Sequence, residues 1–207
     1  MPSTRILLTG FGAFPGARSN PTVELVRRLA GSRRLARLGI AVEGRVLPVV
    51  FNEIEASLVA ALAAPRPDAV IHLGLAARRR TLCVETRALN RLGPLRADAA
   101  RRLAGRGIIR PGGPPVRSSR WPSARLVAAM NPAAPTRLSI DAGDYLCNQT
   151  LYLTLETTCL PTGFIHVPRP GRRGRADDRR RPSLAAMARA IEAALLVVAV
   201  EIRRRRT

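Results

Sequence analysis

Residues 5–11 read RILLTGF, and this apolar run sets a pattern that the rest of the chain repeats. An uninterrupted apolar stretch of this length predicts a buried β-strand. Asn20 and Pro21 then predict the start of a helix that runs through Leu29, because asparagine is a preferred N-cap and proline suits the first helical position. A strand followed by a helix is the first unit of an α/β fold.

The same order of strand and helix recurs along the chain. Further strands are predicted at residues 40–49, 69–75, 81–89, 137–140 and 163–167, and further helices from Asn52 (with Glu55 completing a capping-box pattern), at 123–130, at 146–158 and from about Ser183. Residues 91–115 and 169–182 lose this periodicity and are rich in Gly, Pro and Arg, so we expect loops there.

This alternation predicts an α/β protein built as a three-layer α/β/α sandwich with a largely parallel (mixed) central sheet. The 207 residues suffice for a substantial core, and we expect one domain over residues 1–207. Ligands of such sheets bind at the carboxyl ends of the strands. A site is therefore expected in the loops after residues 11, 75, 89, 140 and 167.

The net charge of +21 is the signature of a nucleic-acid-binding protein, but its distribution argues against one. All 35 basic residues are Arg, they are spread through the chain, and aromatic residues for base stacking make up 3%. A genome that favours Arg codons would produce the same bias. We therefore expect a diffuse basic surface with nonspecific affinity for nucleic acid.

The spacing of the cysteines and the hydropathy of the chain indicate in which cellular compartment the protein belongs. Cys83, Cys147 and Cys159 lack the paired spacing of a zinc site or a redox dithiol, which favours a reducing compartment. Residues 6–10 are too short a run for a signal-peptide core. Residues 184–202 contain charged residues at helical spacing, which predicts an amphipathic helix rather than a membrane span.

Cys147 is the candidate nucleophile. It stands at or near the start of a predicted helix, directly after a loop that contains Gly143. Backbone N–H groups and the helix dipole stabilise a thiolate there, and the same groups can stabilise an oxyanion. The alternative is a small buried apolar cysteine, which is how we interpret Cys83 and Cys159.

His166 is the candidate base, because it lies near the end of a predicted strand, where side chains face the ligand edge of the sheet. His72 lies deeper in a strand and fits a hydrogen-bonded core position. Glu85 ends an apolar stretch, so its carboxylate needs a partner. Orienting the imidazole of a Cys-His pair would supply one, and a salt bridge to Arg87 or Arg79 would do so equally well.

The first loop holds Phe11 and Phe14, two of the four phenylalanines of the chain. Aromatic side chains in a loop at the ligand edge indicate an apolar pocket, and packing of the loop on the core is an equal alternative. The glycines of this loop do not have the G-x-G-x-x-G spacing that dinucleotide binding requires.

Several segments together resemble the type I pyroglutamyl peptidases (pyrrolidone-carboxylate peptidases). The matching segments are Leu8-Thr9-Gly10-Phe11 with Phe14, Asn20-Pro21, Leu47-Pro48-Val49, His72-Leu73-Gly74-Leu75-Ala76, Glu85 with Ala88-Leu89-Asn90, Asp141-Ala142-Gly143 with Tyr145-Leu146-Cys147-Asn148, and Gly163-Phe164-Ile165-His166-Val167-Pro168. They run in order from the first predicted strand to the last.

This resemblance implies a thiol protease that hydrolyses the bond after an N-terminal pyroglutamyl residue of a peptide. It implies a catalytic triad and a lactam pocket, placed by matching position on Cys147, His166 and Glu85 for the triad and on Phe11, Phe14, Asn20, Tyr145 and Leu146 for the pocket. It also implies an α/β/α sandwich, no metal or cofactor, a cytosolic location and frequently a homotetramer.

The chain also departs from the family pattern. An Arg-Ile-Pro-Asp-Asn-like run is usual after the glutamate, and residues 95–99 read LRADA here, which leaves the place of Arg96 open. Arg78 replaces a usual glycine, and residues 169–173 add further cations near the expected entrance. Such cations would favour acidic residues after the pyroglutamate or obstruct the site. The alternatives to an active peptidase are a catalytically weakened relative and an Arg-rich nucleic-acid-binding protein.

Overall fold

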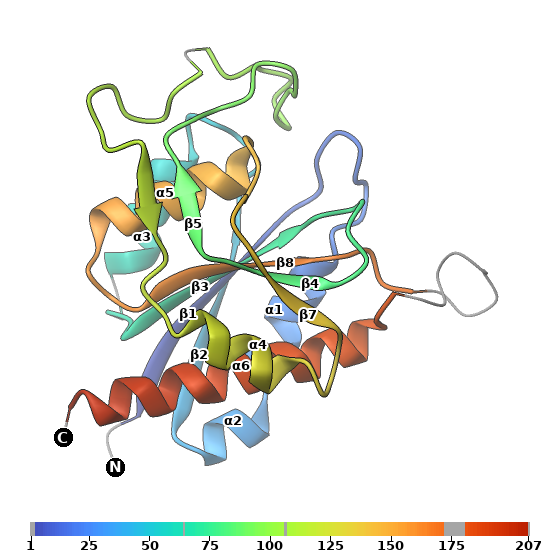
Figure 1. Cartoon of the computed structure of the whole chain (residues 1–207), viewed down its shortest axis with the longest axis vertical. Helices are drawn as coiled ribbons and strands as arrows, with labels where there is room; N and C mark the ends of the chain where they lie inside the picture. Colours follow the sequence, from blue (N-terminus) through green and yellow to red (C-terminus); the bar gives the residue numbers. More distant parts are fainter. Residues whose placement is uncertain (1–2, 64, 106, 172–180, 207) are drawn as a thin grey trace.

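A mixed, mostly parallel six-stranded sheet forms the centre of the protein (Figure 1). The computed structural model describes residues 3–63, 65–105, 107–171 and 181–206. In spatial order the strands are β2 (Ile40–Leu47), β1 (Thr4–Phe11), β3 (Ala69–Leu75), β8 (Thr162–Val167), β4 (Leu82–Glu85) and β7 (Thr136–Ser139). The first four strands are parallel, whereas β4 pairs with β8 in the antiparallel sense and β7 runs parallel to β4. The predicted mixed sheet is confirmed.

Helices cover both faces of this sheet, as a three-layer sandwich requires (Figure 1). One face carries α1 (Pro21–Ala30), α4 (Ser123–Met130) and α6 (Leu184–Arg204), and the other carries α3 (Ile54–Ala63) and α5 (Leu146–Thr157). The short helix α2 (Arg33–Arg37) packs beside β2. Within the part of the chain described above, no helix combines the length and the apolar character needed to cross a membrane.

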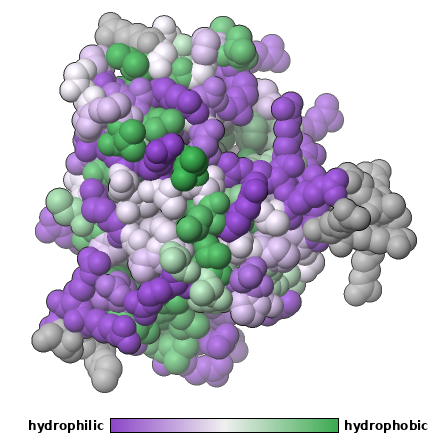
Figure 2. Space-filling model, viewed as in Figure 1, coloured by the Kyte–Doolittle hydropathy of each residue, from purple (hydrophilic) through white to green (hydrophobic). Residues whose placement is uncertain are grey.

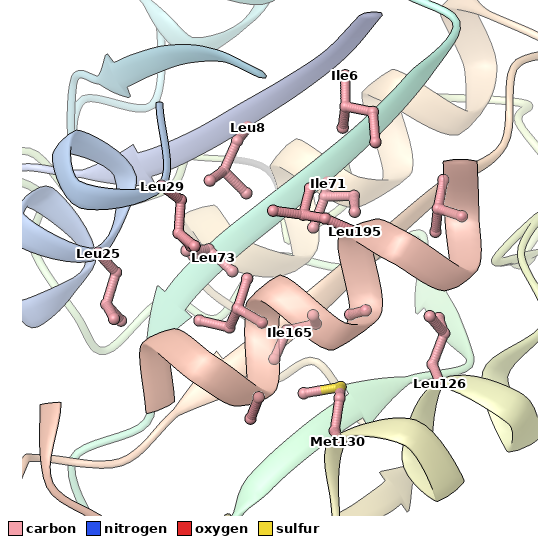
Figure 3. Packing of buried hydrophobic residues seen from close by; sticks show 14 of the residues in the cluster. Ile6, Leu8, Leu25, Leu29, Ile71, Leu73, Leu126, Met130, Ile165 and Leu195 are labelled. Atoms are coloured by element: carbon pink, nitrogen blue, oxygen red, sulfur yellow. The ribbon is translucent and has the colours of Figure 1, made fainter. Parts of the chain in front are cut away.

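A buried aliphatic cluster joins the sheet to α1, α4 and α6 (Figure 3). Its labelled members come from the strands (Ile6, Leu8, Ile71, Leu73 and Ile165) and from the helices (Leu25, Leu29, Leu126, Met130 and Leu195). Each large aliphatic side chain buried in this way contributes roughly 1.5–3 kcal/mol. The cluster therefore holds β3 and β8 rigidly, and these strands carry the site described below.

The opposite face is packed around α5, which is buried on nearly every side. Leu151, Leu153 and Leu155 pack with Phe11 and Phe164 of the sheet and with Leu58 of α3. The polar residues Asn148, Gln149 and Thr154 of α5 are buried as well. This packing fixes the first turn of α5, and with it Cys147.

Two short elements escaped prediction, and one predicted strand was wrong. Residues 81–89 form two strands rather than one, because Thr86 turns the chain by bonding the Ser139 carbonyl through its N–H (2.8 Å) and its hydroxyl (3.0 Å). β5 (Arg87–Leu89) then pairs with the unpredicted β6 (Val116–Ser118) in a separate two-stranded sheet. β6 and α2 are too short to show a period in the sequence.

The helix predicted from Asn52 begins at Ile54, so the predicted capping box is wrong. Glu55 in its first turn pairs with Arg110 instead. The stretch 91–115 holds no helix or strand among its described residues, as predicted, but it is tied down. The side chain of Asn90 accepts hydrogen bonds from the N–H groups of Ile109 (3.0 Å) and Arg110 (2.8 Å).

The surface is polar over most of the face seen in Figure 2, with hydrophobic side chains in small groups. Many of its arginines form ion pairs with nearby carboxylates, such as Arg27 with Glu24 (2.8 Å) and Arg125 with Glu201 (3.0 Å). Such pairs offset part of the positive charge of the surface. Arg172 and Arg173, two of the cations predicted near the entrance, lie outside the described residues.

Candidate active site

A small cavity of about 170 Å³ opens beside the carboxyl ends of β1 and β3. Seven of the eight predicted site residues line it, namely Phe11, Phe14, Asn20, Tyr145, Leu146, Cys147 and His166. The eighth, Glu85, is fully buried and hydrogen-bonds His166. The fold thus brings all eight predicted residues together.

The loop after β7 reaches this cavity from the opposite end of the sheet, which the sequence did not predict. Because β4 and β7 run against β8, the loops after them start at the opposite end of the sheet. The segment after β7 nevertheless returns to the cavity and lines it with Ala142 and Gly143. Gly143 has a φ of 87°, a left-handed turn that favours glycine.

Cys147 is the second residue of α5, as its predicted place at a helix start required. The N-cap residue is Tyr145, and no side chain caps this end of the helix. The N–H groups of the first turn therefore remain available to an anion. Gly74 of β3 leaves the space that the sulfur occupies, since a Cβ on that residue would lie 2.8 Å from Cys147 Sγ.

His166 is buried near the end of β8 and bonds two groups. Its Nδ1 lies 2.8 Å from Glu85 Oε1, which leaves Nε2 to interact with Cys147, the other reactive candidate on the cavity wall. Burial alone lowers the pKa of His166, but the charge of Cys147 and the hydrogen bonds to Cys147 and Glu85 outweigh it and raise the pKa to about 9. The imidazole therefore carries its proton at neutral pH.

The sequence left open whether Glu85 pairs with the imidazole or with an arginine, and in the structure it does both. The same oxygen, Oε1, lies 2.8 Å from His166 Nδ1 and accepts a hydrogen bond from Arg79 Nη1 at 2.6 Å. Arg87, the other proposed partner, donates to the carbonyl of Ile140 instead (2.9 Å). The carboxylate thus orients the imidazole and forms a salt bridge at once.

His72 occupies a core position, as predicted. It is fully buried, and its ring nitrogens lie 2.7 Å from Thr9 Oγ1 and 3.0 Å from Thr154 Oγ1. Burial lowers the pKa of His72 to about 3, so this ring stays neutral.

The aromatic residues divide between pocket and core. Phe11 is 3% exposed and stacks on Phe164 with ring centroids 6.3 Å apart, so it packs on the core while lining the cavity. Phe14 is partly exposed and lies 6.1 Å from the ring of Tyr145. The Tyr145 hydroxyl donates to the carbonyl of Ala97 (2.8 Å), and burial raises the pKa of Tyr145 to about 12.

Asn20 lines the cavity, but most of its hydrogen-bonding capacity serves the fold. Its Oδ1 caps α1 by accepting from the N–H (3.1 Å) and the hydroxyl (2.8 Å) of Thr22. Its Nδ2 donates to the carbonyl of Gly12 (3.1 Å). A contact with a ligand would use the remaining N–H of this amide.

Sequence reasoning missed several lining residues, among them Val49, Leu75, Ala76 and Arg79. Their positions at or just after the ends of predicted strands were the available signal. Arg96, whose place was open, also lines the cavity. Its guanidinium lies 4.9 Å from the centre of the Tyr145 ring and pairs with Asp144, so the altered loop still brings an arginine to the site.

A thiol at a helix N-terminus, an imidazole oriented by a buried carboxylate and an adjoining apolar cavity define the class of this protein as a cysteine peptidase. The sequence model of the family described as pyroglutamyl peptidase matches residues 4–205. The chain belongs to this pyroglutamyl peptidase family.

Relatives and solved structures agree with this membership. The pyrrolidone-carboxylate peptidase of Gloeobacter violaceus is 35% identical over 209 residues, covering 95% of this chain and 98% of the relative, and that of Pyrococcus furiosus is 34% identical over 171 residues, covering 79% and 80%. The structure of pyrrolidone carboxyl peptidase from Thermus thermophilus is 34% identical and matches with a TM-score of 0.82 over 93% of this chain and 99% of that one. Pyroglutamyl peptidase I from Bacillus amyloliquefaciens, 27% identical, matches with a TM-score of 0.88 over 97% and 98%. The predicted family and fold are confirmed.

Proposed function

We propose that this protein removes pyroglutamate from the N-terminus of peptides, with Cys147 as nucleophile, His166 as acid and base, and Glu85 as the residue that orients His166. The observation that carries this proposal is the Glu85–His166–Cys147 arrangement beside an apolar cavity in a chain of the pyroglutamyl peptidase family.

The acylation half of the reaction uses the charged pair. The Cys147 thiolate attacks the carbonyl carbon between the pyroglutamyl ring and the next residue, and the N–H groups at the start of α5 stabilise the oxyanion. As the C–N bond breaks, His166 donates its proton to the leaving amine, and a thioester remains on Cys147. A His166 pKa of about 9 supplies this proton at neutral pH.

Hydrolysis of the thioester then restores the enzyme. His166, now neutral, takes a proton from water, and the resulting hydroxide attacks the thioester carbon. The C–S bond breaks, the Cys147 thiolate leaves, and free pyroglutamate is released. The imidazolium and thiolate are then ready for the next peptide.

Specificity would come from the cavity. Phe11, Phe14, Tyr145 and Leu146 would offer an apolar wall to an uncharged lactam ring, and the remaining N–H of Asn20 would meet its polar edge. A ring-opened N-terminal glutamate would bring two charges into a space too apolar to solvate them.

Three further proposals accompany this function. Residues 1–207 would fold as one pyroglutamyl-peptidase domain that acts in the cytoplasm and assembles as a homotetramer. The family membership and the three unpaired cysteines support the first two, and the resemblance alone supports the tetramer. Sedimentation equilibrium of the purified protein measures the oligomeric state.

A chromogenic pyroglutamyl amide tests the proposed function directly. Cys159 is exposed, so its interpretation as a buried cysteine was wrong, whereas Cys83 is buried. We expect turnover by the wild type and by Cys159→Ser, and none by Cys147→Ser. A folded wild type without turnover would reject the function and favour a catalytically weakened relative. Steeply salt-dependent DNA binding without hydrolysis would favour the nucleic-acid alternative.

A further inference from the structure

Arg79 lies in the turn between β3 and β4, and its guanidinium joins two parts of the candidate site. Its Nη1 donates to Glu85 Oε1 (2.6 Å), and its Nη2 donates to the carbonyl of Asp141 (2.7 Å), in the loop that leads to Cys147. The backbone of Arg79 is held as well, by a bond from its N–H to Ala76 (2.9 Å) and one from Arg181 to its carbonyl (2.9 Å). The guanidinium is thus fixed in position toward Glu85.

The carboxylate of Glu85 depends on this arginine. It is fully buried, Oε1 serves both His166 and Arg79, and Oε2 has no hydrogen-bond partner among the described residues. A buried carboxylate is costly unless a cation accompanies it. While His166 carries a proton, Glu85 has two cationic partners. After His166 gives the proton away, Arg79 remains as the permanent one.

We propose that Arg79 is a positioning residue that gives Glu85 a cationic partner while His166 is neutral, so that His166 can release its proton to the leaving amine and take one back from water. This proposal rests on the proposed function. Without the guanidinium, loss of the imidazole proton would leave a buried carboxylate with no cationic partner, so the Glu85–His166 pair would hold its proton more tightly. Losing the repulsion between Arg79 and the imidazolium acts in the same direction.

Other ionisable groups around His166 are placed differently. Cys147 of α5 hydrogen-bonds the imidazole, and Cys83 of β4 is its direct cross-strand partner and also lies beside Arg79. His72 of β3 stays neutral, since its pKa is about 3. The carboxylate of Asp141 pairs with Arg91 (2.9 Å), and Arg80, the next residue of the turn, is exposed. The dependence on Arg79 therefore acts through Glu85.

Two substrates and two variants test this role. Arg79→Met is expected to lower kcat/KM for a pyroglutamyl peptide amide roughly tenfold or more, because proton transfer to the amine is impaired. The loss should be much smaller for a pyroglutamyl p-nitrophenyl ester, whose phenolate leaves without a proton. The alkaline limb of the pH profile should move to higher pH. Arg79→Lys should return the alkaline limb to its wild-type position and restore part of kcat/KM.

Arg87→Met is the matched control, because Arg87 donates to the neighbouring Ile140 carbonyl rather than to Glu85. It should keep the wild-type profile. Wild-type kinetics in Arg79→Met, or an equal loss for amide and ester at every pH, would overturn the proposal.

A second readout needs no substrate. The chain has two histidines, so labelled imidazoles can be followed individually by NMR. The titration midpoint of His166 should rise in Arg79→Met, and an unchanged midpoint would also overturn the proposal. If the wild type shows no turnover, the proposed function fails, while this titration still tests Arg79.

Discussion

Glu85 and His166 meet along a diagonal between two antiparallel strands. The direct partner of Glu85 across these strands is Phe164, and His166 faces Cys83, yet Glu85 Oε1 lies 2.8 Å from His166 Nδ1. Long side chains reach one another along such diagonals. The imidazole is therefore oriented from a paired strand inside the sheet rather than from a loop.

Removing the charge of Glu85 should lower the pKa of His166, so that the imidazole holds its proton less tightly. Glu85→Gln keeps the size of the side chain but removes an anion that raises the pKa of His166, and it leaves Arg79 to repel the imidazolium. We expect the alkaline limb of kcat/KM to move to lower pH, opposite to Arg79→Met, and the rate to fall roughly 100-fold. Glu24→Gln, in an exposed pair, serves as control. An unmoved limb would contradict the role of Glu85.

A methyl group on Gly74 should disturb the nucleophile. Its Cβ would lie 2.5 Å from Phe164 Cζ and 2.8 Å from Cys147 Sγ, closer than such contacts allow. We expect Gly74→Ala to lose most of its turnover of the chromogenic amide and to react more slowly with a thiol reagent at Cys147. Gly105→Ala, which would meet no atom within 4 Å, should behave as wild type. Equal activity of both variants would refute this reading of Gly74.

Phe11 and Phe14 should separate stability from binding. Phe11→Ala empties a core position and should cost about 3–5 kcal/mol of unfolding free energy. Phe14 is partly exposed, so Phe14→Ala should mainly raise KM for the pyroglutamyl amide. Urea unfolding and steady-state kinetics of both variants check this division. A KM for Phe14→Ala equal to that of the wild type would show that Phe14 does not contribute to substrate binding.

His72 should make the protein acid-sensitive. Its pKa is about 3 in the folded state against 6.5 unfolded, so between these values the unfolded chain binds the extra proton and stability falls as pH falls. The slope from this residue is roughly 1.4 kcal/mol per pH unit. His166 has the opposite sign: its stabilisation is complete below pH 6.5 and is lost as pH rises toward about 9.

Urea unfolding of the wild type and of His72→Gln at pH 5 and pH 7 measures the effect of His72. The variant should lose less stability on acidification than the wild type does. Parallel losses in the two proteins would show that other groups cause the acid sensitivity.

The turnover of peptides that differ in the residue after the pyroglutamate should show whether the arginines at the entrance contact the substrate. Arg79 and Arg96 line the cavity but pair with Glu85 and Asp144, whereas Arg78 is exposed. We expect peptides with Asp at this position to turn over faster than those with Lys at low salt, and the difference to shrink at high salt. Equal turnover of the Asp and Lys peptides at low salt would contradict this prediction.

Local patterns in the sequence determined the positions of Cys147 and His166. A turn-forming glycine before a helix start and an apolar run ending near a histidine are set by a few neighbouring residues. The same reasoning placed His72 in the core, since its whole strand is apolar. Short elements such as α2 and β6 offered too few residues for a period to show.

The partners of Glu85 were decided only by the tertiary structure. Glu85 and His166 are 81 residues apart, and their contact exists because β4 runs antiparallel beside β8. Strand order and direction follow from how the sheet buries its faces against the helices, a property of the whole chain that the residues around Glu85 do not encode. The sequence by itself therefore named the candidate reactive groups, and long-range packing decided that Glu85 meets both His166 and Arg79.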